Sequence, residues 1–179
     1  MIRQPAPDSK DWTWVLREPC PECGFDCSSP DRSALADLIA AVGDRWVVAV
    51  RDRDDIRQRP APAVWSPLEY SCHVRDVFGL ATYRVQLMLD EDAPSFANWD
   101  QDATAIADDY ASQDPDEVLD ALSAAARQFA QAVAVVPEAA WERTGLRTDG
   151  AVFTVESFVR YLVHDPVHHL TDVTGDRWV

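Results

Sequence analysis

Apolar residues recur at helical spacing in four stretches of the chain, and the first two stretches begin with recognisable helix signals. The first follows Ser29-Pro30-Asp31, where a polar start and a proline near the first turn are typical of a helix N-terminus. The second begins at Ser66-Pro67-Leu68-Glu69, a capping-box pattern with proline at the first helical position. Both are predicted to be helices. Their apolar positions are Leu35, Leu38, Ile39, Val42, Trp46 and Val50 in the first, and Val77, Leu80, Ala81, Val85 and Met88 in the second.

The third and fourth stretches show the same period. The third begins at Asp114-Pro115-Asp116-Glu117 and is closed by Pro137, and the fourth begins at Thr154 and ends near Gly175. The proline at position 166 removes a hydrogen bond inside the fourth stretch, so we expect a kink or a break there. The apolar positions are Val118, Leu119, Leu122, Phe129 and Val133 in the third, and Val155, Phe158, Val159, Leu162, Val163 and Leu170 in the fourth.

Four helices of this length, each with one apolar stripe, pack most economically as a four-helix bundle, so the predicted fold class is all-α. A chain of 179 residues is long enough for one domain with a real core and short for two. We expect a single domain over residues 1–179, with an N-terminal Cys-containing segment over 1–28 and a helical bundle over about 29–175. Loops are expected in the first thirty or so residues, at 57–62 and at 91–114.

Charge and composition argue against several classes of partner. A formal net charge of -15 repels phosphate backbones, so nucleic-acid binding is not expected. No apolar stretch is long enough to cross a bilayer, and the first residues lack the apolar core of a secretory signal. We therefore expect a cytoplasmic protein, a monomer or a homodimer, with neither nucleic acid nor membrane as partner.

Three of the four cysteines, Cys20, Cys23 and Cys27, lie in one short segment. In a cytoplasmic protein this spacing indicates reduced thiols or a metal rather than disulfides. A Cys-x-x-Cys-Gly turn brings both sulfurs to one side of a metal and forms half of a zinc knuckle. A second metal site would then use these three cysteines with a remote ligand, either Cys72 or a histidine. The competing interpretation is a tight turn with small buried side chains.

All but one of the histidines lie in the fourth stretch, and the remaining one, His73, lies in the second. Two side chains four positions apart on a helix project side by side, and a third from a facing helix completes a metal site with open positions. Two pairs compete, Asp165 with His169 and His164 with His168, and we expect only one pair to face inward. The apolar face runs beside Asp165 and His169, which favours that pair, whereas a rotation at the proline would favour His168.

Ordinary hydrogen bonds can also satisfy a buried histidine or aspartate, and a lone His73 would more often be such a residue than a ligand. Three such residues together change the balance, because a carboxylate at the edge of an apolar stripe is costly to bury unless a cation or a donor neutralises it. The residues alone support the metal and the purely structural interpretation about equally.

Two motifs in these helices match a known family. In the second helix a tryptophan precedes a histidine, Trp65-Ser66-Pro67-Leu68-Glu69-Tyr70-Ser71-Cys72-His73, and the last helix carries an Asp/Glu/His-x-x-x-His pair, Asp165-Pro166-Val167-His168-His169. With these motifs the chain resembles the DinB-like, or YfiT-like, superfamily of metal-dependent four-helix bundles. It also resembles actinobacterial relatives that include mycothiol-dependent maleylpyruvate isomerase. The resemblance runs from about the first predicted helix to the C-terminus, and it implies His73, Asp165 and His169 as metal ligands.

The resemblance also implies a reaction. A divalent metal would activate a low-molecular-weight thiol as thiolate, which attacks an electrophile or assists an isomerisation. We therefore predict a metal-dependent thiol transferase or isomerase, with mycothiol as cosubstrate and an electrophilic small molecule as substrate. A mixed histidine and carboxylate set suits Zn, Ni, Fe or Mn, and Asp165 stands where relatives often have His or Glu, which leaves the metal open.

Three further residues are assigned around this centre. Asp172, about one turn beyond His169, is predicted to orient one of the metal ligands without contacting the metal itself. Trp99 and Asp100 are predicted to contact substrate where the long loop folds over the site, although Trp99 is better explained as a core anchor. Two alternatives stay open: a non-catalytic metal- or ligand-binding, stress-associated bundle, whose centre would be occluded, and a metal-assisted hydrolase that uses bound water.

Overall fold

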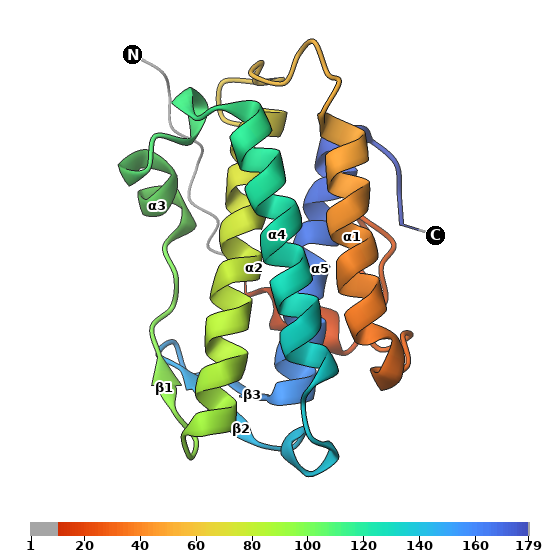
Figure 1. Ribbon diagram of the computed structural model, residues 1–179, viewed down its shortest axis with the longest axis vertical. Helices are drawn as coiled ribbons and strands as arrows, with labels where there is room; N and C mark the ends of the chain where they lie inside the picture. Colours follow the sequence, from red (N-terminus) through yellow and green to blue (C-terminus); the bar gives the residue numbers. More distant parts are fainter. Residues whose placement is uncertain (1–10, 179) are drawn as a thin grey trace.

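Four long helices run side by side in the computed structural model, which describes residues 11–178 (Figure 1). They are α1 (Leu35–Val50), α2 (Pro67–Asp90), α4 (Pro115–Ala134) and α5 (Val155–Thr174). Helix α4 packs against both α1 and α2, and α5 packs against the same two helices from the other side. The consecutive helices α1 and α2 therefore lie diagonally across the bundle. The predicted all-α four-helix bundle is confirmed.

The helix starts are those that the sequence predicts. At α2 the Ser66 hydroxyl accepts from the Glu69 backbone N–H (3.3 Å), and the Glu69 carboxylate accepts from the Ser66 N–H (2.9 Å), which completes the capping box. At α4 the Asp114 carboxylate accepts from two backbone N–H groups of the first turn. Helix α5 begins with a capping box at Thr154 and ends at Gly175, whose φ of 78° is the left-handed conformation that favours glycine.

Proline 166 does not interrupt α5, so the expected break is wrong. The helix runs without a gap from Val155 to Thr174. Residues on both sides of the proline, among them Val163 and Val167, are buried in the core, so packing outweighs the lost intrahelical hydrogen bond. The Trp46 indole N–H of α1 donates to the Pro166 carbonyl oxygen (2.9 Å) and ties the two helices together at this point.

The core fills the space between the four helices. Trp46, Phe78, Phe129 and Phe158 are fully buried there. Helices α1 and α4 approach closely at Gly43, where an added Cβ would lie 2.4 Å from the Ala126 Cβ, so a larger side chain would force the helices apart.

A small sheet and short helices close one end and one side of the bundle. The sheet has the order β1-β2-β3, with β1 (Ser95–Phe96) parallel to β2 (Thr144–Arg147) and β2 antiparallel to β3 (Val152–Thr154). The strands are too short for a readable period, which is why the sequence did not indicate them. The expectation of a plain loop over 91–114 is wrong in part, because this segment contains β1, helix α3 (Gln101–Ala107) and the 3-10 helix η3 (Tyr110–Ser112).

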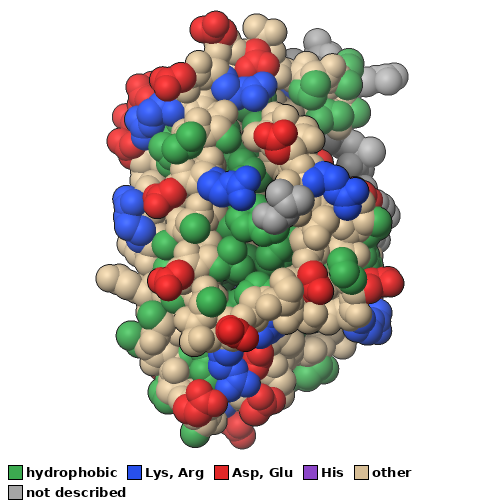
Figure 2. All heavy atoms as spheres, turned by 90° about the vertical axis from the view of Figure 1, so that its right-hand side faces the viewer, with side chains coloured by type: hydrophobic (Ala, Val, Ile, Leu, Met, Phe, Trp, Pro, Cys, Tyr) green, Lys and Arg blue, Asp and Glu red, His purple; other side chains and the backbone are tan. Residues whose placement is uncertain are grey.

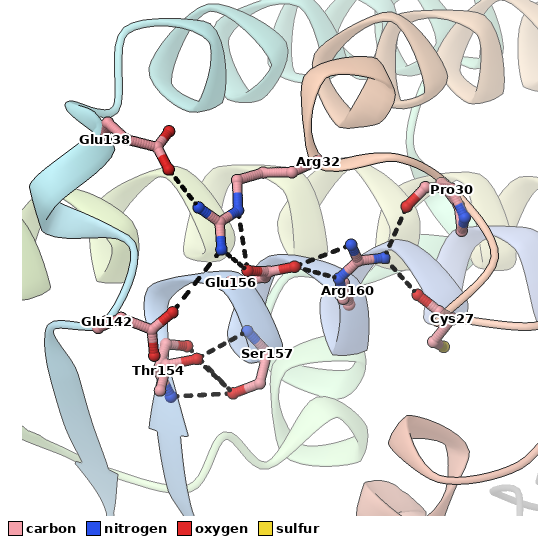
Figure 3. A network of polar contacts seen from close by, with 9 residues as sticks. All are labelled: Cys27, Pro30, Arg32, Glu138, Glu142, Thr154, Glu156, Ser157 and Arg160. Carbon is pink, nitrogen blue, oxygen red and sulfur yellow. Dashed lines mark hydrogen bonds and ion pairs between the residues drawn. The ribbon is translucent and has the colours of Figure 1, made fainter.

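The segment before α1 packs along α5 and contains the 3-10 helices η1 (Trp12–Leu16) and η2 (Arg32–Ala34). Figure 3 shows how ion pairs and backbone contacts fix its second half. Arg160 of α5 donates to the carbonyl oxygens of Cys27 (2.7 Å) and Pro30 (3.0 Å) and pairs with Glu156 (2.8 Å). Arg32 pairs with the same Glu156 carboxylate. The division at residue 28 stays a prediction.

The face formed around α1 and the C-terminal segment has no continuous charge of one sign. Figure 2 shows apolar side chains gathered in a shallow hollow there, with acidic and basic side chains interspersed around it. No histidine is visible on this face. Among the described helices none is long and apolar enough to cross a membrane.

Candidate metal centre

His73, Asp165 and His169 come together where α2 faces α5. The His73 Nε2 lies 3.1 Å from Asp165 Oδ1, and the His169 Nε2 lies 3.8 Å from the same oxygen. One donor atom from each of the three residues lies within 4.8 Å of the other two. This is the set that the sequence predicts, and its donors, two imidazole nitrogens and one carboxylate oxygen, fit a divalent metal with open coordination positions.

The His73 imidazole is held rigidly between two tryptophans. Its ring lies 5.3 Å from the Trp65 ring and stacks on Trp99 at 5.3 Å with an interplanar angle of 4°. His73 is fully buried, and its Nδ1 has no hydrogen-bond partner among residues 11–178. The other nitrogen, Nε2, is the one directed at Asp165, so the ring presents a single polar atom to the centre.

The Asp165 carboxylate is ionised in this setting. Burial alone would raise its pKa, but the imidazoles of His73 and His169 outweigh this effect and hold the pKa well below its usual value. An ionised carboxylate between two imidazole nitrogens is a competent ligand for a cation.

Asp172 holds the His169 ring from the far side. Its Oδ2 lies 2.8 Å from His169 Nδ1, which leaves Nε2 of the same ring turned toward Asp165. Burial would raise the pKa of Asp172, but the hydrogen bond with His169 and the charges of His169 and His168 together outweigh it and lower the pKa. A carboxylate on the outer nitrogen is the usual way in which a metal-binding histidine is oriented. The contact predicted for Asp172 is therefore present, and its role in metal binding stays a prediction.

A cavity of about 490 Å³ opens beside the centre, and Asp165 and His169 line it. The two side chains are 33% and 18% exposed, so the centre is reachable rather than occluded. Trp99 and Asp100 also line the cavity. Trp99 serves as an anchor as well, because its indole N–H donates to the Thr104 hydroxyl (2.8 Å), and the Asp100 carboxylate caps helix α3.

A second cluster lies beside the first on α5. Here Cys20 and Cys23 meet His164 and His168, with one donor atom from each of the four residues within 4.8 Å of the others. The expectation that only one pair of α5 residues faces inward is wrong. The outer face of α5, which periodicity assigns to solvent, is covered by the N-terminal segment, so both pairs are buried or half-buried.

Burial favours the neutral forms of Cys23 and His164 in this second cluster. It raises the pKa of the Cys23 thiol to about 12. It also lowers the pKa of His164 to about 4, with a smaller contribution from the neighbouring His168.

The other two cysteines lie outside this cluster, which corrects the predicted set of Cys20, Cys23 and Cys27. Cys27 is buried in the core, and Arg160 holds its backbone carbonyl several residues beyond the turn. Cys72 faces the Tyr110 carbonyl oxygen (3.8 Å) on another side of α2. Of the two remote ligands that the sequence left open, Cys72 or a histidine, the structure places histidines beside the cysteine pair.

Sequence reasoning missed two arginines of the cavity wall, Arg84 and Arg147. For Arg84 a signal existed, since it lies three turns after His73 on the stripe that includes Val77, and a charge on a buried stripe is unusual. Arg147 lies in the unpredicted strand β2 and pairs with Asp149 (2.8 Å). Its position follows from the sheet, which no pattern in the sequence indicated.

Comparison with known proteins agrees with this fold. Residues 44–173 match the family model of the DinB superfamily. The fold is similar to that of YfiT from Bacillus subtilis, with a TM-score of 0.73 and 17% sequence identity over 92% of this chain and 96% of that one. YfiT is described as a probable metal-dependent hydrolase with an unusual four-helix bundle topology. No curated protein matches the chain in sequence.

Proposed function

Because the chain belongs to the DinB superfamily, we propose that it is a divalent-metal-dependent enzyme acting on small molecules, with His73, Asp165 and His169 as the metal's ligands. The observation that carries this proposal is the convergence of three donor atoms within 4.8 Å of one another at the wall of a cavity. A non-catalytic bundle would need no such access, whereas cavities of a few hundred cubic ångströms are typical of small-molecule sites.

The bound cation would supply a Lewis acid that lowers the pKa of a coordinated nucleophile. The protein's own part is to hold the donors in place. Trp65 and Trp99 fix the His73 ring from two sides, and Asp172 fixes the His169 ring through Nδ1. Rigid donors keep the remaining coordination positions directed at the cavity.

The nucleophile comes from outside the protein. The described residues that line the cavity include no serine and no cysteine. Cys72, although one residue from His73, is turned toward Tyr110, and burial raises the pKa of its thiol to about 12. A small thiol or a water molecule is therefore the reacting group.

A low-molecular-weight thiol of the mycothiol type is the nucleophile that we favour. The cavity volume of about 490 Å³ accommodates part of a thiol cosubstrate together with an electrophile. In a transfer reaction the sulfur forms a bond to an electrophilic carbon, the leaving group departs with its bonding electrons, and the thiol proton passes to solvent. In an isomerisation the thiol adds to the substrate and is expelled again, so it is regenerated.

Metal-assisted hydrolysis is the second candidate, and the description of YfiT as a probable metal-dependent hydrolase favours it. The same three ligands would then serve a bound water. Both candidates act on small molecules, in keeping with a formal charge of -15 that disfavours nucleic acid and anionic membrane surfaces as partners.

The test compares thiol-dependent and water-dependent turnover in metal-loaded protein. A chlorobimane electrophile is offered with mycothiol, with cysteine and without thiol, and a nitrophenyl ester is offered in parallel. We expect thioether formation that requires the metal and is lost in His169→Ala. Asp90→Asn, an exposed change at the far end of α2, is the control and keeps the activity. Ester hydrolysis without thioether formation would instead establish the hydrolase. Metal retained in both His73→Ala and His169→Ala would refute the ligand assignment.

A further inference from the structure

The second cluster on α5 has the composition of a complete metal site. Cys20 and Cys23 come from one turn, and His164 and His168 lie one turn apart on one face of the helix. All four are buried, with exposed fractions of 1%, 0%, 4% and 7%. Two cysteines and two histidines form one of the standard ligand sets of structural zinc. The family match begins at residue 44, so the cysteine half lies outside it.

The distances fit zinc coordination. The Cys20 sulfur lies 3.6 Å from His168 Nδ1, and the Cys23 sulfur lies 3.7 Å from His164 Nε2. With zinc–sulfur and zinc–nitrogen bonds of usual length and a tetrahedral angle, a sulfur and a nitrogen ligand are separated by about 3.6 Å. Two separate thiol–imidazole hydrogen bonds would explain each distance alone. They would not require all four donor atoms to meet within 4.8 Å.

The backbone around the cysteines is shaped as a knuckle. The Gly24 N–H donates to the Cys20 carbonyl oxygen (2.8 Å), and the Cys20 N–H donates to the Phe25 carbonyl oxygen (2.9 Å). Gly24 has a φ of 85°, a conformation that favours glycine, and a Cβ there would lie 2.9 Å from the Trp178 carbonyl oxygen. Both the backbone conformation and the lack of space therefore favour glycine at this position. This turn places both sulfurs on the side that faces α5.

Neighbouring side chains close the cluster and support its histidines. The Trp12 ring lies 5.7 Å from the His164 ring and 5.0 Å from the His168 ring. The outer nitrogen of His168, Nε2, lies 3.6 Å from a Glu22 oxygen, close enough for charge attraction to a protonated or metal-bound imidazole. A buried set of four protein ligands leaves no position for substrate, which distinguishes a structural from a catalytic site.

We propose that Cys20, Cys23, His164 and His168 bind one zinc ion in a closed tetrahedral site that is separate from the His73 centre. The zinc ion joins the N-terminal segment to α5. It thereby holds Trp12 in the wall of the substrate cavity, while the Arg160 contacts fix the other half of the segment (Figure 3).

The test is the zinc content of the full-length protein, purified without oxidation. Wild type is expected to hold one more zinc equivalent than Cys20→Ser/Cys23→Ser, and His73→Ala/His169→Ala is expected to keep that equivalent. Cys27→Ser, the same change at a buried cysteine outside the cluster, is the matched control and retains it. After replacement by cobalt, sulfur-to-cobalt charge-transfer absorption should appear in wild type and vanish only in the Cys20→Ser/Cys23→Ser protein.

A mercurial titration of wild type needs no variant and guards against misfolding. Reaction of the thiols should release one zinc equivalent to a chromophoric chelator. Failure to release any zinc after all four cysteines have reacted would overturn the proposal. A Cys20–Cys23 disulfide in freshly purified, zinc-free protein would overturn it as well. Neither result depends on activity, so the proposed function is tested separately.

Arg84 carries a second and independent inference. This residue of α2 is only 6% exposed and forms no ion pair with any carboxylate of residues 11–178. Within that range its one hydrogen bond runs from Nη2 to the Ala97 carbonyl oxygen (2.6 Å), and its guanidinium lies 4.8 Å from the centre of the Phe96 ring. Burial, with repulsion from Arg147, lowers its pKa to about 10, so the group is still a cation at neutral pH.

A buried cation without a counter-ion is costly unless something neutralises it. Arg84 lines the same cavity as Asp165 and His169, and the neighbouring Arg147 is already paired with Asp149. We infer that Arg84 binds a carboxylate group of the small molecule that occupies this cavity. The inference rests on the proposed function only in taking this cavity as the substrate site.

The test measures binding of butanoate and of its neutral analogue butanamide by calorimetry. It uses the His73→Ala/His169→Ala background, so that no metal at that centre can attract the carboxylate. A charge-assisted contact predicts that Arg84→Gln weakens butanoate binding about tenfold or more and leaves butanamide unchanged, while Arg84→Lys restores part of the affinity. Equal butanoate affinity with and without Arg84, or no butanoate binding at all, would overturn the inference. An enzyme that is active but fails this test would refute only the role of Arg84.

Discussion

Helix α5 carries two clusters of potential ligands that differ in donors and in access. Asp165 and His169 meet His73 beside the cavity and are 33% and 18% exposed, whereas His164 and His168 reach the same cavity wall but are more buried and meet two cysteines under the N-terminal segment. His168 and His169 are adjacent in the chain, and because successive helix positions are about 100° apart they turn to different partners. The comparison shows that one helix can bring potential ligands to two neighbouring clusters with different partners. The two clusters both contain histidines, and they differ in how exposed their side chains are and in whether the other donors are carboxylate oxygens or cysteine sulfurs.

The largest effect is expected on activity. His169→Ala removes a donor of the open centre and should lower metal-dependent turnover at least about a thousandfold, because the Lewis acid supplies several kcal/mol of transition-state stabilisation. The measurement is kcat/KM of metal-loaded protein. His168→Ala should reduce turnover far less, since His168 is not among the proposed ligands of the open centre. Equal losses in the two variants would remove the distinction between the centres.

The next effect is expected on stability. Cys20→Ser/Cys23→Ser should lower the free energy of unfolding by about 3 kcal/mol or more, since binding of a structural zinc contributes to folding directly. Denaturant unfolding followed by circular dichroism measures the change. Addition of a strong chelator to wild type should reproduce most of it and should have little further effect on the double variant. An unchanged midpoint in both experiments would contradict a structural role for the cluster.

A smaller effect is expected from the residue between the two clusters. Asp172 lies 2.8 Å from His169 Nδ1 and 3.9 Å from His168 Nε2. Asp172→Asn should therefore weaken metal binding at the open centre by about 10- to 100-fold and leave the closed one nearly intact. Competition with a calibrated chelator gives both affinities. A greater loss at the cysteine-containing cluster would reverse the assignment of Asp172.

The smallest effect concerns the start of α2, one turn before His73. The buried Glu69 carboxylate pairs with Arg59 (2.8 Å) and accepts from the Ser66 N–H. Burial would raise the pKa of Glu69, but these contacts outweigh it and hold the pKa below the ordinary value of 4.5. Glu69→Gln should cost about 1–2 kcal/mol at pH 7.

The sign of the pH dependence follows from this lowered pKa. The stabilisation by ionised Glu69 is fully present above pH 4.5, the ordinary value, and is lost as the pH falls through the lowered pKa of the folded protein. The difference in unfolding free energy between wild type and Glu69→Gln should therefore shrink below pH 4.5. A difference that stays constant down to pH 3 would show that Glu69 acts by packing alone.

Local chemistry in the sequence predicted most of the bundle. At helix N-termini such as Ser66-Pro67 and Asp114-Pro115, a side chain accepts hydrogen bonds from backbone N–H groups a few positions away. Because these contacts join only neighbours in the chain, the sequence indicates them directly. The same holds for the spacing of Asp165 and His169, which the helix period places side by side. The distribution of the histidines indicated His73 as the partner from a facing helix, the family motifs imply the same set, and the structure brings these three residues together.

The sequence by itself determined the four helices, their apolar stripes and the candidate ligands on them, because these depend on contacts within a few residues. Only the tertiary structure decided that both pairs on α5 have partners, since what covers the outer face of that helix is a segment some 140 residues away in the chain. It also decided the continuity of α5 through Pro166 and the place of Arg84 in the cavity. Helical period gives the direction of a side chain, but its burial and partners depend on packing between distant segments.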